Sequence, residues 1–131
     1  MSTGNRPLSP HLQVYKPQIT SVLSILHRIT GIGLAVGTLA LVLWLGAIAG
    51  GEFYYESARA LITHWFGQVC LISWTWALFY HFCNGIRHML WDIGLGLEMN
   101  QVRISGWFII FASVLLTLVS WSITLRLFGN L

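Results

Sequence analysis

The sequence predicts an all-α integral membrane protein with three transmembrane helices, its N-terminus in the cytoplasm and its C-terminus outside. Three observations predict this class: 56% of the 131 residues are hydrophobic, only 8% are charged, and the mean hydropathy is +0.71. Soluble domains carry about 25% charged residues, so seven basic and four acidic side chains are too few to cover a water-facing surface. A soluble globular enzyme and a disordered tail are excluded, and two cysteines are too few for a disulfide-stapled secreted domain.

Three long stretches contain no Lys, Arg, Asp or Glu: residues 29–51, 60–86 and 104–125. A helix needs about 20 apolar residues to cross a hydrocarbon layer of ~30 Å, because each residue rises by ~1.5 Å. We therefore predict one membrane-anchor domain over residues 1–131, with helices near residues 22–49, 65–91 and 104–127. Residues 1–21, which hold all three prolines, are predicted to form a cytoplasmic arm that is extended or turning.

Glycines recur in the first predicted span, at Gly31, Gly33, Gly37 and Gly46. Glycine weakens a helix in water, but in a membrane bundle its missing side chain lets two helix backbones approach closely. We therefore expect this span to pack against a neighbouring helix through its glycine positions.

Basic residues near the span ends are distributed unevenly. Five lie before the first span or around the turn between the second and third: Arg6, Lys16, Arg28, Arg87 and Arg103. Only Arg59 and Arg126 lie on the other side. Because basic residues concentrate on the cytoplasmic side of a membrane, this asymmetry places the N-terminus in the cytoplasm or its matrix equivalent. The scattered basic residues form no patch for nucleic acid, although the pI is about 9.2.

Two clusters of polar residues lie within the predicted spans, where ionisable groups are costly and need a partner or a function. The first cluster shares one helix face at i, i+3, i+4 and i+7 spacing: Ser24, His27, Arg28 and Gly31. The second forms a stripe at i, i+4 and i+7 spacing: His81, Gly85 and His88. Because the first span enters and the second leaves on the cytoplasmic side, both clusters are expected at a similar depth.

His81 is the histidine expected deepest in the membrane, since it lies 11 residues, or about 16 Å of helix, before Asp92. A neutral imidazole there is a candidate axial ligand for a haem iron, and Gly85 would leave room for the flat macrocycle. Basic side chains nearer the cytoplasm would pair with the haem carboxylates: His27, Arg28 and His88. The alternative is a histidine that hydrogen-bonds across helices for packing, and the residues alone leave both interpretations open.

Ligation by two histidines would require another chain, because we expect no deep histidine in the first span and find none in the third. Ser24 and Arg28 offer a hydroxyl and a guanidinium beside apolar surface, which suits the carbonyl oxygens of a quinone. The alternative interpretation is that Arg28 only orients the span by the positive-inside rule and that Ser24 has no role. His11 and His64 lie outside the spans and receive no role.

The order and spacing of these motifs resemble the cytochrome b556 membrane-anchor subunits of succinate dehydrogenase, or complex II. Ser-x-x-His-Arg-x-Thr-Gly begins at Ser24, His-x-x-x-Gly-x-Arg-His-x-x-x-Asp begins at His81, and the lead-in Arg-Pro-Leu-Ser-Pro-His-Leu-Gln-Val-Tyr begins at Arg6. The resemblance covers about residues 6–126. It implies a subunit that pairs with a second small anchor protein, shares one haem b with it, and holds the flavoprotein and iron–sulfur subunits on the lipid bilayer.

The resemblance also implies roles for individual residues. His81 would be the haem ligand, Ser24 and Arg28 would contact ubiquinone, and His27 and His88 would lie near the haem carboxylates. Gly85, Arg87 and Asp92 fit the motif in structural or electrostatic roles.

The implied function is that of a non-catalytic electron-transfer and anchor subunit, serving electron flow from succinate through iron–sulfur centres to ubiquinone. The implied location is a bacterial cytoplasmic membrane or, alternatively, the mitochondrial inner membrane. Three other functions remain open: a cofactor-free structural anchor, the equivalent subunit of a fumarate reductase, and a small proton-conducting bundle that uses His81 and His88.

Overall fold

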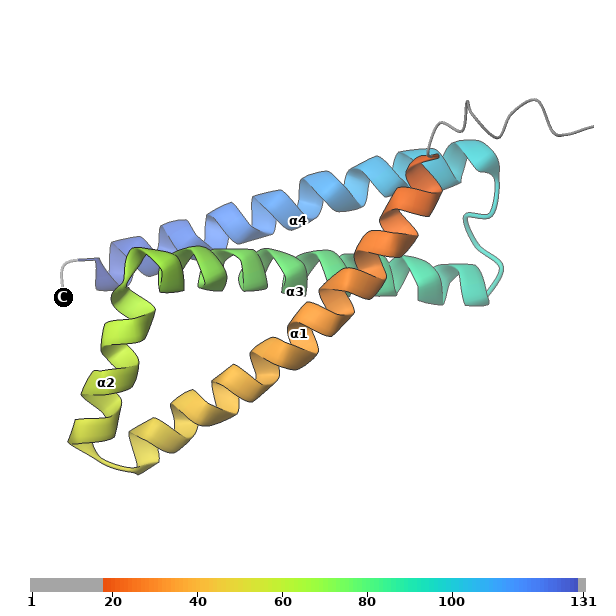
Figure 1. Ribbon diagram of the computed structural model, residues 1–131. Helices are drawn as coiled ribbons and strands as arrows, with labels where there is room; N and C mark the ends of the chain where they lie inside the picture. Colours follow the sequence, from red (N-terminus) through yellow and green to blue (C-terminus); the bar gives the residue numbers. More distant parts are fainter. Residues whose placement is uncertain (1–17, 130–131) are drawn as a thin grey trace, which may run out of the picture.

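The computed structural model describes residues 18–129, except for the side chain of Phe128, and contains four α-helices (Figure 1). The helices are α1 (Ile19–Ala49), α2 (Glu52–Thr63), α3 (Trp65–Asp92) and α4 (Met99–Phe128). No strand occurs between residues 18 and 129, so the all-α class is confirmed. The predicted arm, with Pro7, Pro10 and Pro17, lies outside the described residues as far as residue 17.

Two of the described helices are long and apolar enough to cross a membrane, namely α1 and α4. Helix α3 has 28 residues, a length of about 42 Å, so it is also long enough. Its buried Asn84 and Arg87 and the half-buried His81 make it more polar than the other two. For α3, composition alone therefore does not identify a membrane span.

The three long helices meet at one end of the molecule. Helices α3 and α4 run side by side in opposite directions, and the N-terminal half of α1 crosses them (Figure 1). The C-terminal half of α1 diverges from α3, and α2 connects the two at the far end (Figure 1). The start of α1, the end of α3 and the start of α4 consequently lie near one another, and both sequence clusters lie toward this end.

Helix α2 occupies a segment in which the charge pattern predicted no helix. Gly51, with φ 99°, reverses the chain after α1 in a backbone region that other residues rarely adopt. Glu52 then lies in the first turn, where a negative charge favours the helix N-terminus. The exposed Arg59 and Glu56 side chains approach within 3.5 Å on this helix. Helix α2 is therefore a short helix with charged, exposed side chains, and it lies between two long apolar helices.

The buried core is small and lies where the three long helices meet, around Leu23, Tyr80 and Ile109. Gly106 on α4 makes room for Leu23, since a Cβ added there would lie 2.7 Å from the Leu23 Cδ1 atom. Glycine also permits close approach at Gly31, which faces His81, and at Gly37, which faces Trp74. At Gly33 and Gly46, no atom of the described residues lies within 4 Å of an added Cβ, so close approach at these two positions stays a prediction.

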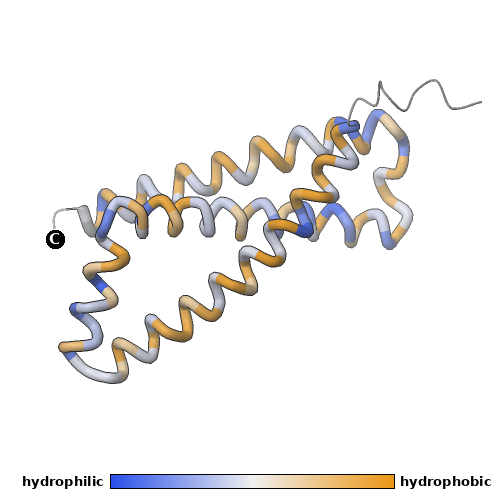
Figure 2. The backbone as a smooth tube through the Cα atoms, viewed as in Figure 1, coloured by the Kyte–Doolittle hydropathy of each residue, from blue (hydrophilic) through white to orange (hydrophobic). Residues whose placement is uncertain are grey.

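Apolar side chains cover most of the outer surface of the long helices. Figure 2 shows hydrophobic residues along α1 and α4, with hydrophilic residues gathered mainly at the two ends, on α2 and where α1 crosses α3. Leu43 on α1 and Ile104 on α4 are among the many large apolar residues that are exposed. Such a surface suits lipid or apolar partner helices rather than water.

Candidate functional site

Three histidines come together where α1 crosses α3. The rings of His27 and His81 are stacked, with centroids 3.9 Å apart and planes inclined by 11°. The His27 and His88 ring centroids are 5.3 Å apart. The two sequence clusters therefore meet in space.

The structure corrects one expectation about the first span, namely that it contains no histidine as deep as His81. His27 lies level with His81 because their rings are in contact. Helix α1 begins at Ile19, so His27 lies about two helical turns after the N-terminal end of the helix. Each of the two crossing helices thus supplies one imidazole at the same height.

The His81 ring is held by groups from α1. Its Nδ1 atom lies 3.2 Å from the carbonyl oxygen of His27 and 3.4 Å from the Thr30 hydroxyl oxygen. The Thr30 hydroxyl, in turn, is 2.9 Å from the carbonyl oxygen of Leu26 and 3.0 Å from that of His27. One side of the His81 imidazole is therefore occupied by the backbone and a side chain of the neighbouring helix.

The surroundings of this ring fit a flat, iron-containing group. A Cβ added to Gly85, one turn from His81, would meet no atom of residues 18–129 within 4 Å, so none of them covers this part of the α3 surface. The Nδ1 atom of His27 is buried and has no hydrogen-bond partner among residues 18–129. Imidazole is also a usual axial ligand of haem iron. The residues present are thus chemically suited to haem, with His81 as the candidate ligand.

The two candidate quinone residues lie on the outer side of α1. Ser24 is half-buried, whereas Arg28 is exposed. Within residues 18–129, Arg28 forms no hydrogen bond or ion pair, and its guanidinium donors are available to a ligand or another chain. Asp92 is likewise exposed, at the last residue of α3.

A second polar stripe on α3 consists of Arg87, which the sequence analysis named, and of Tyr80 and Asn84, which it missed. Tyr80 and Asn84 are fully buried, and Arg87 is 5% exposed. The Tyr80 hydroxyl donates to the carbonyl oxygen of Leu23 over 2.9 Å, which joins α3 to α1. These residues follow i, i+4 and i+7 spacing, so the rule that identified the histidine stripe could have found them.

Arg87 joins α3 to α4. Its guanidinium donates to the Ser105 hydroxyl over 3.0 Å, to the Val102 carbonyl oxygen and to the Asn84 side-chain oxygen. The guanidinium carbon also lies 4.1 Å from the centre of the Trp91 ring, a cation–π distance. Trp91 donates to the carbonyl oxygen of Gly96 over 3.1 Å, which anchors the turn between the helices.

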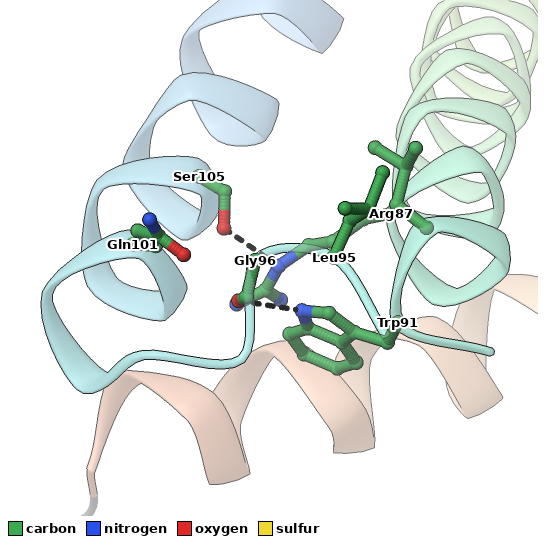
Figure 3. Close-up of a pocket in the computed structure, with 7 residues that line it drawn as sticks. Arg87, Trp91, Leu95, Gly96, Gln101 and Ser105 are labelled. Atoms are coloured by element: carbon green, nitrogen blue, oxygen red, sulfur yellow. Dashed lines mark hydrogen bonds between the residues drawn. The ribbon is translucent and has the colours of Figure 1, made fainter. Parts of the chain in front are cut away.

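A pocket of about 320 Å³ lies beneath this turn, next to Arg87. Figure 3 shows the Arg87 side chain reaching toward Ser105 beside the Trp91 ring. The remaining lining residues are mostly apolar or lie on the turn: Leu90, Leu95, Gly96 and Gln101. None of the three clustered histidines lines this pocket, so it is separate from the candidate haem site.

The fold and the site together define a helical membrane protein that gathers imidazoles between two crossing helices. Residues 2–120 match the family model described as succinate dehydrogenase/fumarate reductase transmembrane subunit. The chain therefore belongs to this family of succinate dehydrogenase and fumarate reductase membrane subunits, and the resemblance drawn from its motifs is confirmed.

Individual relatives agree with the family assignment. The chain is 47% identical over 118 residues to a succinate dehydrogenase cytochrome b556 subunit of Rickettsia typhi, covering 90% of this chain and 92% of that protein. It is 38% identical over 120 residues to the protein of the same description from Paracoccus denitrificans, covering 92% of each. It is also 41% identical over 122 residues to a succinate dehydrogenase cytochrome b560 subunit of Marchantia polymorpha, covering 88% of each.

Proposed function

We propose that this chain is the haem b-binding membrane anchor of a succinate dehydrogenase, serving electron transfer from succinate through iron–sulfur centres to ubiquinone. The observation that carries the proposal is the His81 imidazole, fixed on one side by α1 and flanked by the open Gly85, in a member of this family. The chain itself transforms no substrate. Its residues hold and orient the groups between which electrons move.

His81 would hold the haem iron, which supplies a one-electron carrier when haem is bound. His88 lies on the same side of α3, and His27 is stacked on His81, so both would lie near the haem carboxylates. The His27 and His81 rings lie face to face with centroids 3.9 Å apart, so a flat haem would not fit between them. We therefore assign the second ligand to a partner, a second small anchor subunit that shares the haem.

Ser24 and Arg28 would form part of the ubiquinone site. Arg28 is exposed, and within residues 18–129 its donors are unused, so it can donate to a quinone carbonyl oxygen from its helix face. Its fixed positive charge would favour the negative charge that develops on that oxygen during reduction. Ser24 would add a hydroxyl donor one turn earlier on the same face.

We further propose that three helices cross the membrane, because α3 runs antiparallel to α4 and is nearly as long. The end with the α3–α4 turn would face the cytoplasm and receive the iron–sulfur and flavoprotein subunits. Asp92, exposed at the end of α3, would lie at that surface. The location would be a bacterial cytoplasmic membrane or the mitochondrial inner membrane, with lipid around the apolar surface.

The test is a visible difference spectrum of the purified detergent-solubilised complex, reduced first with succinate and then with dithionite. A b-type band raised by succinate would support haem, partners and electron donor together. A band seen only with dithionite would support the haem and leave its connection to succinate open, since a haem of low potential is not reduced by that donor. An intact complex without a band would favour a cofactor-free structural anchor and contradict the proposal.

A further inference from the structure

We propose that Thr30, together with the carbonyl group of His27, is a positioning element that fixes the proton of His81 on Nδ1 and leaves Nε2 as the atom that binds iron. This inference rests on the proposed haem-binding role of His81. It assigns a function to a side chain on α1 that has none from the sequence motifs.

The hydrogen bonds around the Thr30 hydroxyl determine which partner donates. The hydroxyl oxygen lies 2.9 Å from the Leu26 carbonyl oxygen and 3.0 Å from the His27 carbonyl oxygen. Both are acceptors, so the single hydroxyl hydrogen of Thr30 is directed to the helix backbone. Toward His81, the Thr30 oxygen can therefore only accept.

The same conclusion follows for the second contact of His81. Its Nδ1 atom lies 3.2 Å from the His27 carbonyl oxygen, which has no proton to give, and 3.4 Å from the Thr30 oxygen. Two acceptors face one nitrogen, so Nδ1 carries the proton and Nε2 keeps its lone pair. Histidines that bind metals usually donate their other ring N–H to a carbonyl or similar acceptor, which fixes the tautomer and makes the ligand more basic.

Packing fixes the ring as well as its proton. Thr30 is 4% exposed, so its hydroxyl is enclosed by the two helices. A Cβ added to Gly31 would lie 3.1 Å from the His81 Cε1 atom and 3.7 Å from Nδ1. Thr30 and Gly31 on α1 therefore determine the distance between the His81 imidazole and helix α1.

The first test replaces Thr30 by valine, which preserves the shape of the side chain but removes the oxygen. In the purified complex we expect a higher haem midpoint potential, because a less basic imidazole stabilises ferric iron less. We also expect altered low-spin electron paramagnetic resonance g values and about tenfold faster haem loss to apomyoglobin. Thr30→Ser, which restores an oxygen, should recover the wild-type values.

The matched control is Thr38→Val. The Thr38 hydroxyl donates to its own helix over 2.9 Å like that of Thr30, but it is exposed on α1. This variant should leave the potential, the g values and the rate of haem loss unchanged. If Thr30→Val behaves as Thr38→Val does, the positioning role is overturned.

A second pair of variants tests the packing part of the inference, namely that the Thr30 and Gly31 face of α1 sets the position of the His81 ring, and it removes no hydroxyl. Gly31→Ala should shift the g values, because its methyl group crowds the His81 ring. Gly33→Ala adds a methyl group where no atom of the described part of this chain lies within 4 Å, and it should leave the g values unchanged. Identical spectra for the two alanine variants would contradict the inference.

A His81→Leu complex prepared in parallel separates this inference from the function on which it rests. If His81→Leu loses haem while Thr30→Val and Gly31→Ala match the wild type, the haem role stands and the positioning role fails. If His81→Leu keeps its haem, both fail.

Discussion

Arg28 and Arg87 carry the same guanidinium group, but they lie in opposite surroundings. Arg87 is enclosed between α3 and α4 and uses its donors on Asn84, Val102 and Ser105. Arg28 is exposed, and no described residue takes up its donors. We therefore expect substitution of Arg87 to change stability and substitution of Arg28 to change quinone chemistry.

Replacing Arg87 with methionine should destabilise the assembled complex by about 1–3 kcal/mol. The fully buried Asn84 side-chain oxygen loses its donor, and an unsatisfied buried polar group costs about that much. The measurement is the thermal midpoint of the purified complex in detergent. Arg103→Met is the matched control, because Arg103 is exposed near the start of α4 and should have little effect. An unchanged midpoint for Arg87→Met would contradict the helix-joining role.

Replacing Arg28 with leucine should preserve assembly and haem but lower the kcat/KM of quinone reduction about tenfold or more. A hydrogen bond from a charged donor contributes about 1.5–3 kcal/mol, which corresponds to that loss. Succinate oxidation by an artificial acceptor that bypasses the quinone site serves as the internal control and should be unaffected. Normal quinone turnover in this variant would refute the assigned role.

At the residue scale, the helical spacing of residues predicted which side chains share a helix face. It did not predict which neighbouring helix that face contacts. The stripe of His81, Gly85 and His88 was recognised because imidazoles in a membrane are unusual. Tyr80 and Asn84 follow the same spacing and went unnoticed, since their role depends on the crossing of α1 over α3. The contact between His27 and His81 likewise depends on the crossing of the two helices, which no residue pattern specifies.

At the element scale, the lengths of charge-free sequence predicted the three long helices to within a few residues. Helix α4 begins at Met99, five residues before the predicted start, because charge marked the span edge while the helix continues through Arg103. Helix α2 was missed because a short polar segment between two spans looks like a loop when only charge is considered. Its start depends on the backbone reversal at Gly51.

The packing of α1 on α3 makes a prediction at this scale. Gly37→Ala should destabilise the complex by about 1–3 kcal/mol, because the new methyl group collides with the Trp74 ring and overpacking costs this much. Gly46→Ala is the matched control on the same helix and should be neutral, because no described residue of this chain lies within 4 Å of the added methyl group. Thermal midpoints measure both, and equal midpoints would show that Gly37 is not a close-packing site.

At the scale of the whole molecule, the three proposed crossings would place α2 and the α3–α4 turn on opposite sides of the membrane. Single cysteines at the exposed Ser57 and Gln101 test this arrangement in a background in which Cys70 and Cys83 are serine. In intact bacterial cells, a membrane-impermeant maleimide should label Ser57→Cys, and Gln101→Cys should react only after permeabilisation. Labelling of both positions in intact cells would contradict the proposed topology.

The central claim concerns the whole assembly, since we propose that this chain supplies His81 as one haem ligand and that a partner supplies the other. The most direct measurement is the haem-to-flavin ratio of the purified His81→Leu complex, taken from its reduced-minus-oxidised spectrum. His64→Asn, which retains a capping acceptor at the start of α3, is the control at the far end of that helix. We predict loss of the b-type band in His81→Leu and a normal band in His64→Asn, and a normal band in His81→Leu would contradict the account.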